Sequence, residues 1–149
     1  MYKHVLLPHD GSELAAAAFK QAILFAKFMG AKLTMMHVVP PFHLKVRTWA
    51  TPETMMDKIE KDHDAEAVAE ARKVMANLQG EAKAQGVDAA SVVVVGEHPY
   101  RSIIDQAGAS GCDVIVMASH GRSGLEGFLL GSETVKVLTH SKIPVLVVR

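Results

Sequence analysis

Four closely spaced glycines are the feature of this sequence that most suggests chemistry, because glycine lets a backbone come close to an anionic group. Gly121, Gly124, Gly127 and Gly131 fall within eleven residues of the segment MASHGRSGLEGFLLGSETV, between an apolar run and a segment with helical character. Three interpretations fit this clustering: a phosphate cradle, a mobile hinge, and plain turn geometry.

The end of that segment, Gly131-Ser132, lies where a helix is predicted to begin. Free backbone N–H groups at a helix N-terminus and the helix dipole together favour an anion. The Ser132 hydroxyl can cap the helix or bond a phosphate oxygen. Two interpretations therefore stay open: a phosphate site, and a glycine-rich connection between strand and helix that Ser132 caps.

The familiar nucleotide and hydrolase signatures are missing from the sequence. No GxxxxGK[ST] and no GxGxxG occurs, which disfavours a P-loop NTPase and an ordinary dinucleotide-binding fold. No GxSxG nucleophile motif occurs either, and no residue stands out as a base for water. The lone cysteine, Cys112, precedes an apolar run and is expected to be an inert buried thiol. We therefore predict no catalytic residue.

Four of the eight histidines follow apolar runs: His9, His43, His98 and His120. If these runs are strands, the four side chains can converge on one rim of a sheet. No pair of them has the i,i+4 or HxH spacing of a metal motif, so the pattern favours ordinary polar loop histidines and predicts no metal site.

Two kinds of segment must position these residues. Five short apolar runs are typical of strands covered on both faces of a parallel sheet, and they span residues 4–8, 32–39, 91–96, 113–119 and 144–148. Segments with helical period cover residues 13–29, about 52–86, 99–110 and about 132–141. The first helix is expected to end at Gly30 and to place on or near one stripe Leu14, Ala18, Ile23, Phe25, Ala26 and Met29.

The alternation of strand and helix predicts an α/β protein with a three-layer, doubly wound parallel sheet. With 149 residues the chain suits one domain. Ligands of such sheets bind beyond the carboxyl ends of the strands, where the strand order reverses. The polar sequences expected there are PHDGS, VVPPFH, GEHP and SHGRSGLEGFLLGS. Residues 40–51, after the second strand, form either a binding lid or an irregular excursion.

The charge balance argues against two classes of partner. Sixteen Lys and Arg residues match sixteen Asp and Glu residues, and no run of five like charges occurs. This disfavours a general nucleic-acid binder and a membrane-surface binder. The apolar run near the N-terminus is too short for a signal peptide or a membrane span. A single cysteine fits a reducing compartment, so we expect a cytoplasmic protein.

The glycine segment resembles the nucleotide loop of the universal stress protein family, which reads glycine, two residues, glycine, nine residues, then glycine with serine or threonine. Here Gly121 is the second glycine, nine residues follow, and Gly131-Ser132 closes the motif. Ala118 stands first, where the family's ATP binders usually have glycine. A positive φ would strain its methyl by about 1 kcal/mol, and a ligand packed on its Cα would be crowded. PHDGS, HVV and IPVLVV resemble other parts of the family's pattern, so the resemblance spans essentially the whole chain.

The resemblance implies an ATP site and assigns roles to its residues. Asp10 would contact the ribose or adenine side, and the base would be lined by Met117 with Val38 or Val39. The phosphates would be held by Gly121, Gly131, Ser132 and the backbone N–H of Glu133. The implied site as a whole comprises Pro8, Asp10, Val38, Val39, Met117, Ala118, Gly121, Arg122, Gly131, Ser132 and Glu133. A divalent ion would arrive as Mg²⁺ or Mn²⁺ on the ATP oxygens.

From the residues alone, these roles have structural alternatives. Asp10 is an acceptor at a strand end and can equally form an Asx-turn or cap a helix. The apolar strand-end residues can simply be core. Arg122 is the only cation of the glycine loop; together with Lys45 and Arg47 it can cover a triphosphate, or all three can be solvated.

The resemblance also implies a fold of the adenine nucleotide alpha hydrolase type, with strand order 3-2-1-4-5, and a homodimer formed through the final strand. An apolar VLVV strand at a sheet edge would leave N–H and C=O groups unpaired, which supports that dimer. The leading hypothesis is an ATP-binding universal stress protein that regulates a stress response through unidentified protein partners. Two alternatives stay open: a chaperone-like interaction protein without nucleotide, and a slow ATPase or autophosphorylating protein.

Overall fold

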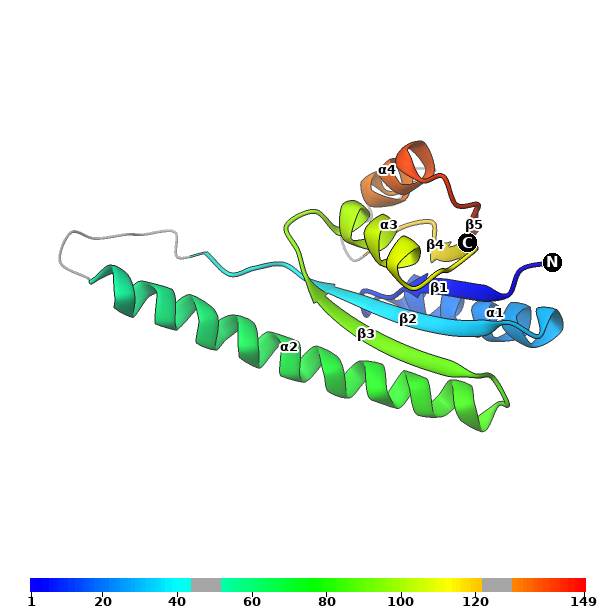
Figure 1. The fold of residues 1–149 in the computed structure, drawn as a ribbon, viewed down its shortest axis with the longest axis horizontal. Coiled ribbons are helices and arrows are strands. Elements are labelled where there is room, and N and C mark those ends of the chain that lie inside the picture. The colour runs from blue at the N-terminus through cyan, green and yellow to red at the C-terminus, as the bar shows by residue number, and fades with distance from the viewer. Residues whose placement is uncertain (44–51, 122–129) are drawn as a thin grey trace.

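A computed structural model describes residues 1–43, 52–121 and 130–149. These residues form a parallel five-stranded sheet in the order β3-β2-β1-β4-β5 (Figure 1). The strands are β1 (His4–Pro8), β2 (Lys32–Val39), β3 (Ala89–Val95), β4 (Val114–Ala118) and β5 (Val145–Val148). The helices are α1 (Glu13–Met29), α2 (Glu53–Ala84), α3 (Pro99–Ala109) and α4 (Ser132–His140). The predicted doubly wound α/β fold and the strand order are confirmed.

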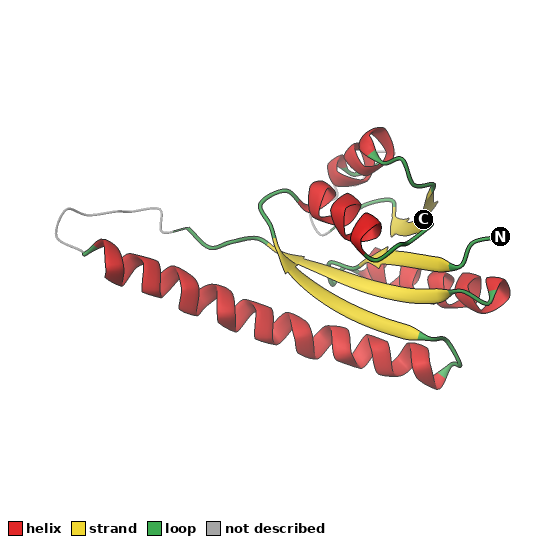
Figure 2. Ribbon diagram, in the orientation of Figure 1, coloured by secondary structure: helices red, strands yellow, loops and turns green. Residues whose placement is uncertain are grey.

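The sheet is covered on both faces, as Figure 2 shows. Side chains alternate across a strand, so β1 sends Val5 and Leu7 to one face and Leu6 to the other, and all three are fully buried. On the first face they pack with α1 and α2 residues such as Phe19 and Met75. On the second face the core includes residues of α3 and α4. Burial on both sides explains why the central strands β1 and β4 are uninterrupted apolar runs, whereas the edge strands β3 and β5 are only partly buried.

Helix α1 begins and ends where the sequence predicts. The Ser12 hydroxyl caps it by accepting the Ala15 N–H at 3.1 Å, and Gly30 ends it with a left-handed φ of 62°. The prediction that Leu14 lies on the apolar stripe of this helix is wrong, because this side chain is 37% exposed. The buried face of α1 follows Ala15 and Phe19 at three-and-four spacing, and Leu14 lies one position before that stripe.

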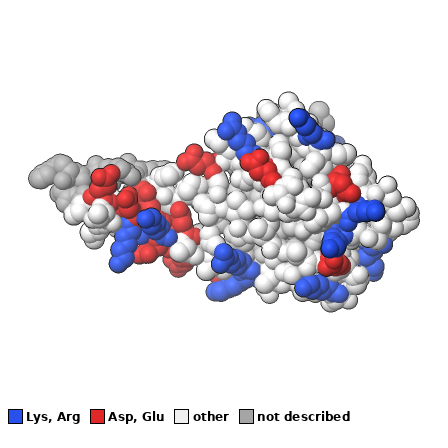
Figure 3. Space-filling view, viewed as in Figure 1, with Lys and Arg blue, Asp and Glu red and all other residues white. Residues whose placement is uncertain are grey.

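Helix α2 packs on the sheet mainly through its C-terminal half, where Ala71, Met75 and Ala82 are buried. Its N-terminal half runs past the end of the sheet (Figure 1). Positive and negative side chains lie interspersed over this half, while the centre of the same face carries few charges (Figure 3). Within the described part of the chain, no helix combines the length and apolar character needed to cross a membrane.

Candidate functional site

The strand order reverses between β1 and β4, which lie side by side in the centre of the sheet. Their parallel register pairs Val5 with Val114 and Leu6 with Ile115. The carboxyl ends of both strands therefore open on the same rim, where ligands of doubly wound sheets bind. The segments that follow them are the Asp10 turn, residues 10–12, and the start of the glycine loop.

The Asp10 carboxylate lies between these two segments. Its Oδ1 accepts the Ser12 N–H at 3.0 Å, so the Asx-turn alternative is confirmed, and the helix cap is Ser12 instead. A Cβ built on Gly121 would come within 2.7 Å of Asp10 Oδ2. The tertiary structure thus brings two of the implied site residues close together, and a side chain at position 121 would have to displace the Asp10 carboxylate.

Gly131 joins the start of α4 to the end of β4. Its N–H donates to the Ser119 carbonyl at 2.7 Å, and the Thr134 hydroxyl donates to the Ala118 carbonyl at 3.1 Å. A Cβ on Gly131 would lie 3.2 Å from His120 Cα. The backbone angles of Gly131, φ −70° and ψ 155°, suit any residue. Glycine is therefore favoured here by the close approach of the His120 backbone and not by its own conformation.

Of the two alternatives left open for Ser132, the helix cap is not found. Gly131 occupies the cap position and has no side chain to act as a cap, and Ser132 is an exposed first helical residue. The reason is the Gly131–Ser119 hydrogen bond, which fixes the entry of the chain so that Ser132 already has helical geometry. Among the residues that the structure describes, no side chain caps the first N–H groups of α4, which leaves them suited to an anion.

The Glu133 side chain contacts the start of α3, which follows the carboxyl end of β3. Its Oε2 accepts the Tyr100 N–H at 2.9 Å in the first turn of α3, and its Oε1 pairs with Lys136 Nζ at 2.7 Å. A carboxylate at a helix N-terminus is stabilised by the helix dipole. The Glu133 and Tyr100 residues are 33 positions apart, so no local sequence pattern predicts this contact.

The apolar residues implied to line a base differ in burial. Met117 is 6% exposed and packs in the core on the α3 and α4 face, and Val39 is 5% exposed. Val38 is half-buried beside the same core. Pro8 ends β1 and is half-buried. All four residues lie at or near the carboxyl ends of their strands. Met117 and Val39 are core residues, which was the structural alternative to lining a base.

Ala118 carries no backbone strain. It is the last residue of β4, and no described residue other than glycine has a positive φ. Its side chain is buried in the core cluster that contains Phe19 of α1. The methyl group therefore occupies the core on the α1 face, and the strain considered from the sequence does not arise.

We expect Ala118→Gly to lower the free energy of unfolding by about 1 kcal/mol, because glycine loses a buried methyl and gains unfolded-state freedom. Adenine-nucleotide affinity should stay within about twofold of the parent, since the methyl points into the core. Chemical denaturation and calorimetric titration measure the two quantities. A tenfold gain in affinity would show that the methyl obstructs the ligand.

His9 lies just beyond the end of β1, as the sequence predicts, but its burial is not that of an ordinary loop histidine. It is only 7% exposed and meets the Phe19 ring edge-on at 6.5 Å. Burial lowers its pKa below the ordinary value and nearby His37 lowers it further, against the opposing effect of Asp10. The sequence did carry a signal for this burial: His9 follows the buried Leu7 by two residues, so the two side chains point to the same face of the sheet.

The other titratable candidates do not form a metal site in the described part of the chain. No three His, Cys, Asp or Glu side chains there lie close enough to hold an ion. His43 instead lies 3.3 Å from the Glu97 carboxylate. Cys112 is buried as predicted, and burial together with Asp113 raises the pKa of its thiol to about 11. Several predicted residues lie outside the described residues: Lys45, Arg47, Arg122, Gly124 and Gly127.

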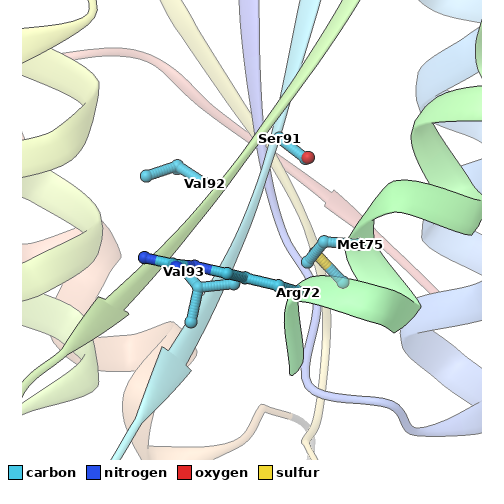
Figure 4. Close-up of a pocket in the computed structure, with 5 residues that line it drawn as sticks. All are labelled: Arg72, Met75, Ser91, Val92 and Val93. Carbon is cyan, nitrogen blue, oxygen red and sulfur yellow. The ribbon is translucent and has the colours of Figure 1, made fainter. Parts of the chain in front are cut away.

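A separate hollow lies between α2 and the edge strand β3 (Figure 4). Its volume is about 340 Å³, and its lining is Arg72, Met75, Ser91, Val92 and Val93. Figure 4 shows Arg72 extending from α2 past Val93. The lining strand residues lie in the middle of β3 and not at its carboxyl end. The lining of this hollow does not include Asp10. The rim of β1 and β4 is therefore the better candidate for the functional site.

Comparison with known proteins gives a consistent result. The family model described as universal stress protein family matches residues 1–149. Universal stress protein MJ0577 of Methanocaldococcus jannaschii is 32% identical over 100% of this chain and 96% of the relative. Universal stress protein YxiE of Bacillus subtilis is 33% identical over the whole of both chains.

Two solved structures extend this likeness to three dimensions. The structure of MJ0577 matches with a TM-score of 0.84 over 99% of this chain and 96% of that one. A universal stress protein crystallised in complex with cAMP is 26% identical, with a TM-score of 0.70 over 99% of this chain and 97% of that one. The chain belongs to the universal stress protein family.

Proposed function

We propose that this universal stress protein binds an adenine nucleotide, ATP, at the rim of β1 and β4 and acts as a regulatory module in a stress response. One observation carries the proposal: the Asp10 carboxylate lies close to Gly121, beside a helix N-terminus that no side chain of the described residues caps. A hydrogen-bond acceptor and a set of N–H donors are thereby brought to one rim.

The charges at this rim support one orientation of the proposed ligand. Ribose hydroxyls are donors and suit the Asp10 carboxylate, whereas phosphates would be repelled by it. Phosphates suit the N–H groups at the start of α4, at Gly131, Ser132 and Glu133. The Glu133 carboxylate would oppose them, but Tyr100 and Lys136 hold it toward α3. The residues present therefore fit a nucleotide with its sugar toward β1 and its phosphates toward α4.

The cAMP complex of a family member supports the adenine class, because that protein shares 26% of its residues with this chain. Mg²⁺ or Mn²⁺ would arrive on phosphate oxygens, since no described cluster of His, Cys, Asp or Glu holds an ion by itself. The protein partners through which the module acts stay unassigned.

The test is to purify the protein natively, denature it, and identify any released nucleotide by chromatography. Apo protein is then titrated with Mg-ATP, with cAMP and Mg-GTP as comparison ligands. We expect bound adenine nucleotide or saturable Mg-ATP binding, and the absence of both at millimolar concentrations would contradict the proposal. Sustained phosphate release above that of a Ser132→Ala variant would instead support the slow ATPase.

We also propose that the protein forms a homodimer through β5. This strand ends the sheet, and its Leu146 is 42% exposed. Beside it, α1 exposes Leu24 by 58% and Phe28 by 83%. A hollow of about 460 Å³ joins these surfaces and is lined by Gln21, Leu24, Phe25, Phe28, Leu146, Val147, Val148 and Arg149. A second copy pairing along β5 would satisfy the edge N–H and C=O groups and cover this apolar surface.

We expect Leu146→Arg to weaken the homodimer by at least tenfold, because the two-fold axis would place two arginines near each other in an apolar contact. Sedimentation velocity across a dilution series measures the dissociation constant. Leu138→Arg is the matched control, since Leu138 is 41% exposed on α4. A parent protein that is monomeric at all concentrations, or equal weakening by both variants, would contradict a β5 dimer.

A further inference from the structure

The side chain of His9 supports the turn that holds Asp10. Its Nδ1 accepts the Gly11 N–H at 3.2 Å, and the next N–H, of Ser12, donates to Asp10 Oδ1 at 3.0 Å. The backbone of His9 is fixed on the β2 side. Its N–H donates to the Met36 carbonyl at 2.8 Å, and its own carbonyl accepts from His37 Nδ1 at 2.7 Å.

These contacts define the protonation state of the ring. Because Nδ1 accepts a hydrogen bond, it carries no proton, and the single proton of the neutral ring lies on Nε2. Nε2 is buried and has no partner among the described residues. A second proton would have to enter at Nδ1, where it would face the Gly11 N–H donor. The present turn geometry is therefore compatible only with the neutral form of His9.

We propose that His9 is a positioning residue whose neutral ring holds residues 10–12 in their ligand-binding shape, so that adenine-nucleotide binding weakens on acidification. This inference rests on the proposed nucleotide site. Protonation at Nδ1 breaks the Gly11 hydrogen bond and draws the adjacent Asp10 carboxylate toward the new positive charge. The carboxylate then leaves the position against Gly121 from which it would bind the ribose.

The groups that act on the His9 ring support the direction of this effect. Asp10 on the same turn favours the protonated ring, and His37 on β2 disfavours it. Helix α1 presents the uncharged Phe19 ring, and β4 contributes Ala118 to the same core cluster. Burial opposes the charged form and lowers the His9 pKa. The balance keeps the ring neutral at neutral pH and makes acid the signal that changes it.

The sign of the pH dependence follows from linkage. The folded-state pKa of His9 is lower than its unfolded value of about 6.5, so the unfolded chain takes up this proton first as the pH falls. The corresponding stability is present above about pH 6.5 and is lost as the pH falls toward the folded-state pKa. If bound nucleotide requires neutral His9, affinity falls below the folded-state pKa, by at most about tenfold per pH unit for one proton.

The test compares the wild-type protein with His9→Asn from about pH 5 to about pH 8. The asparagine Oδ1 can accept the Gly11 N–H but does not titrate. Calorimetric titration with Mg-ATP should show wild-type affinity falling more steeply in acid than that of His9→Asn, with both similar at pH 8. The comparison between variants removes the titration of ATP itself, whose phosphate also protonates near pH 6. His140→Asn, at an exposed site on α4, is the matched control and should follow the wild type.

A second readout needs no ligand. The Gly11 amide resonance of the wild-type protein should titrate below about pH 6.5, because its acceptor becomes a donor. An invariant Gly11 amide, or identical pH dependence of affinity in wild type and His9→Asn, overturns the inference. If the Gly11 amide titrates but no adenine nucleotide binds at any pH, the proposed function fails and with it the link to binding. If His9→Asn does not fold, the wild-type Gly11 titration decides.

Discussion

Gly131→Val should weaken adenine-nucleotide binding by at least tenfold. It should also lower the free energy of unfolding by about 1–3 kcal/mol. Even the first added atom, Cβ, would lie 3.2 Å from His120 Cα and 3.4 Å from the Ser119 carbonyl oxygen. Both are backbone atoms, so they cannot swing aside as a flexible side chain can. The start of α4 must move away from β4, and its N–H groups move with it.

The matched control for this variant is Gly80→Val in α2. A Cβ at Gly80 meets nothing within 4 Å, and valine and glycine differ by less than about 0.5 kcal/mol in helix propensity. We expect Gly80→Val to leave both binding and stability near the parent values. Mg-ATP titration and urea denaturation of the two variants provide the measurements. Unchanged affinity in a folded Gly131→Val protein would show that the start of α4 does not hold the phosphates.

Asp10→Asn should weaken adenine-nucleotide binding by about tenfold or more with little loss of stability. The substitution keeps an oxygen that can accept the Ser12 N–H, so the Asx-turn is retained. It removes the negative charge, and a hydrogen bond to a charged group contributes about 1.5–3 kcal/mol. The Gly121 backbone lies against the second carboxylate oxygen, so the asparagine amide has little room to adjust.

Two further variants separate the charge from the turn. Asp10→Ala removes both the carboxylate and its hydrogen bond to Ser12, so it should bind no better than Asp10→Asn and should also be less stable, by about 1 kcal/mol. Asp57→Asn, at an exposed position of α2, is the control for the loss of one negative charge. Calorimetric titration with Mg-ATP and with 2′-deoxy-ATP tests the ribose contact directly. Full affinity of Asp10→Asn would contradict a role for this carboxylate in binding.

The sequence by itself determined the elements of this protein and their order. Strands covered on both faces must be apolar throughout, and helices with one buried face must carry apolar residues at three-and-four spacing. Both patterns can be seen within a short stretch of sequence. Ser12, Gly30 and Pro99 mark helix ends because caps and breakers act within a few residues. The alternation of strand and helix is compatible with few topologies, so the sequence alone predicts the fold.

The sequence also predicts a site at this rim, since the motif spacing around Gly121 and Gly131 is local. It did not show why those positions are glycine. The contact of Gly121 with Asp10, and of Gly131 with the His120 backbone, joins segments that are distant along the chain. Such contacts depend on how β1, β4 and α4 pack, and no local pattern encodes them.

Only the tertiary structure decided the direction in which individual side chains point at this rim. The Ala118 methyl lies in the core, and the Glu133 carboxylate accepts a hydrogen bond at the start of α3. The His9 side chain is buried next to the turn that carries Asp10. Each outcome is set by the register of neighbouring strands and by hydrogen bonds between remote segments. Local propensity fixes which element a residue joins, whereas packing and the need to satisfy buried polar groups fix what that residue touches.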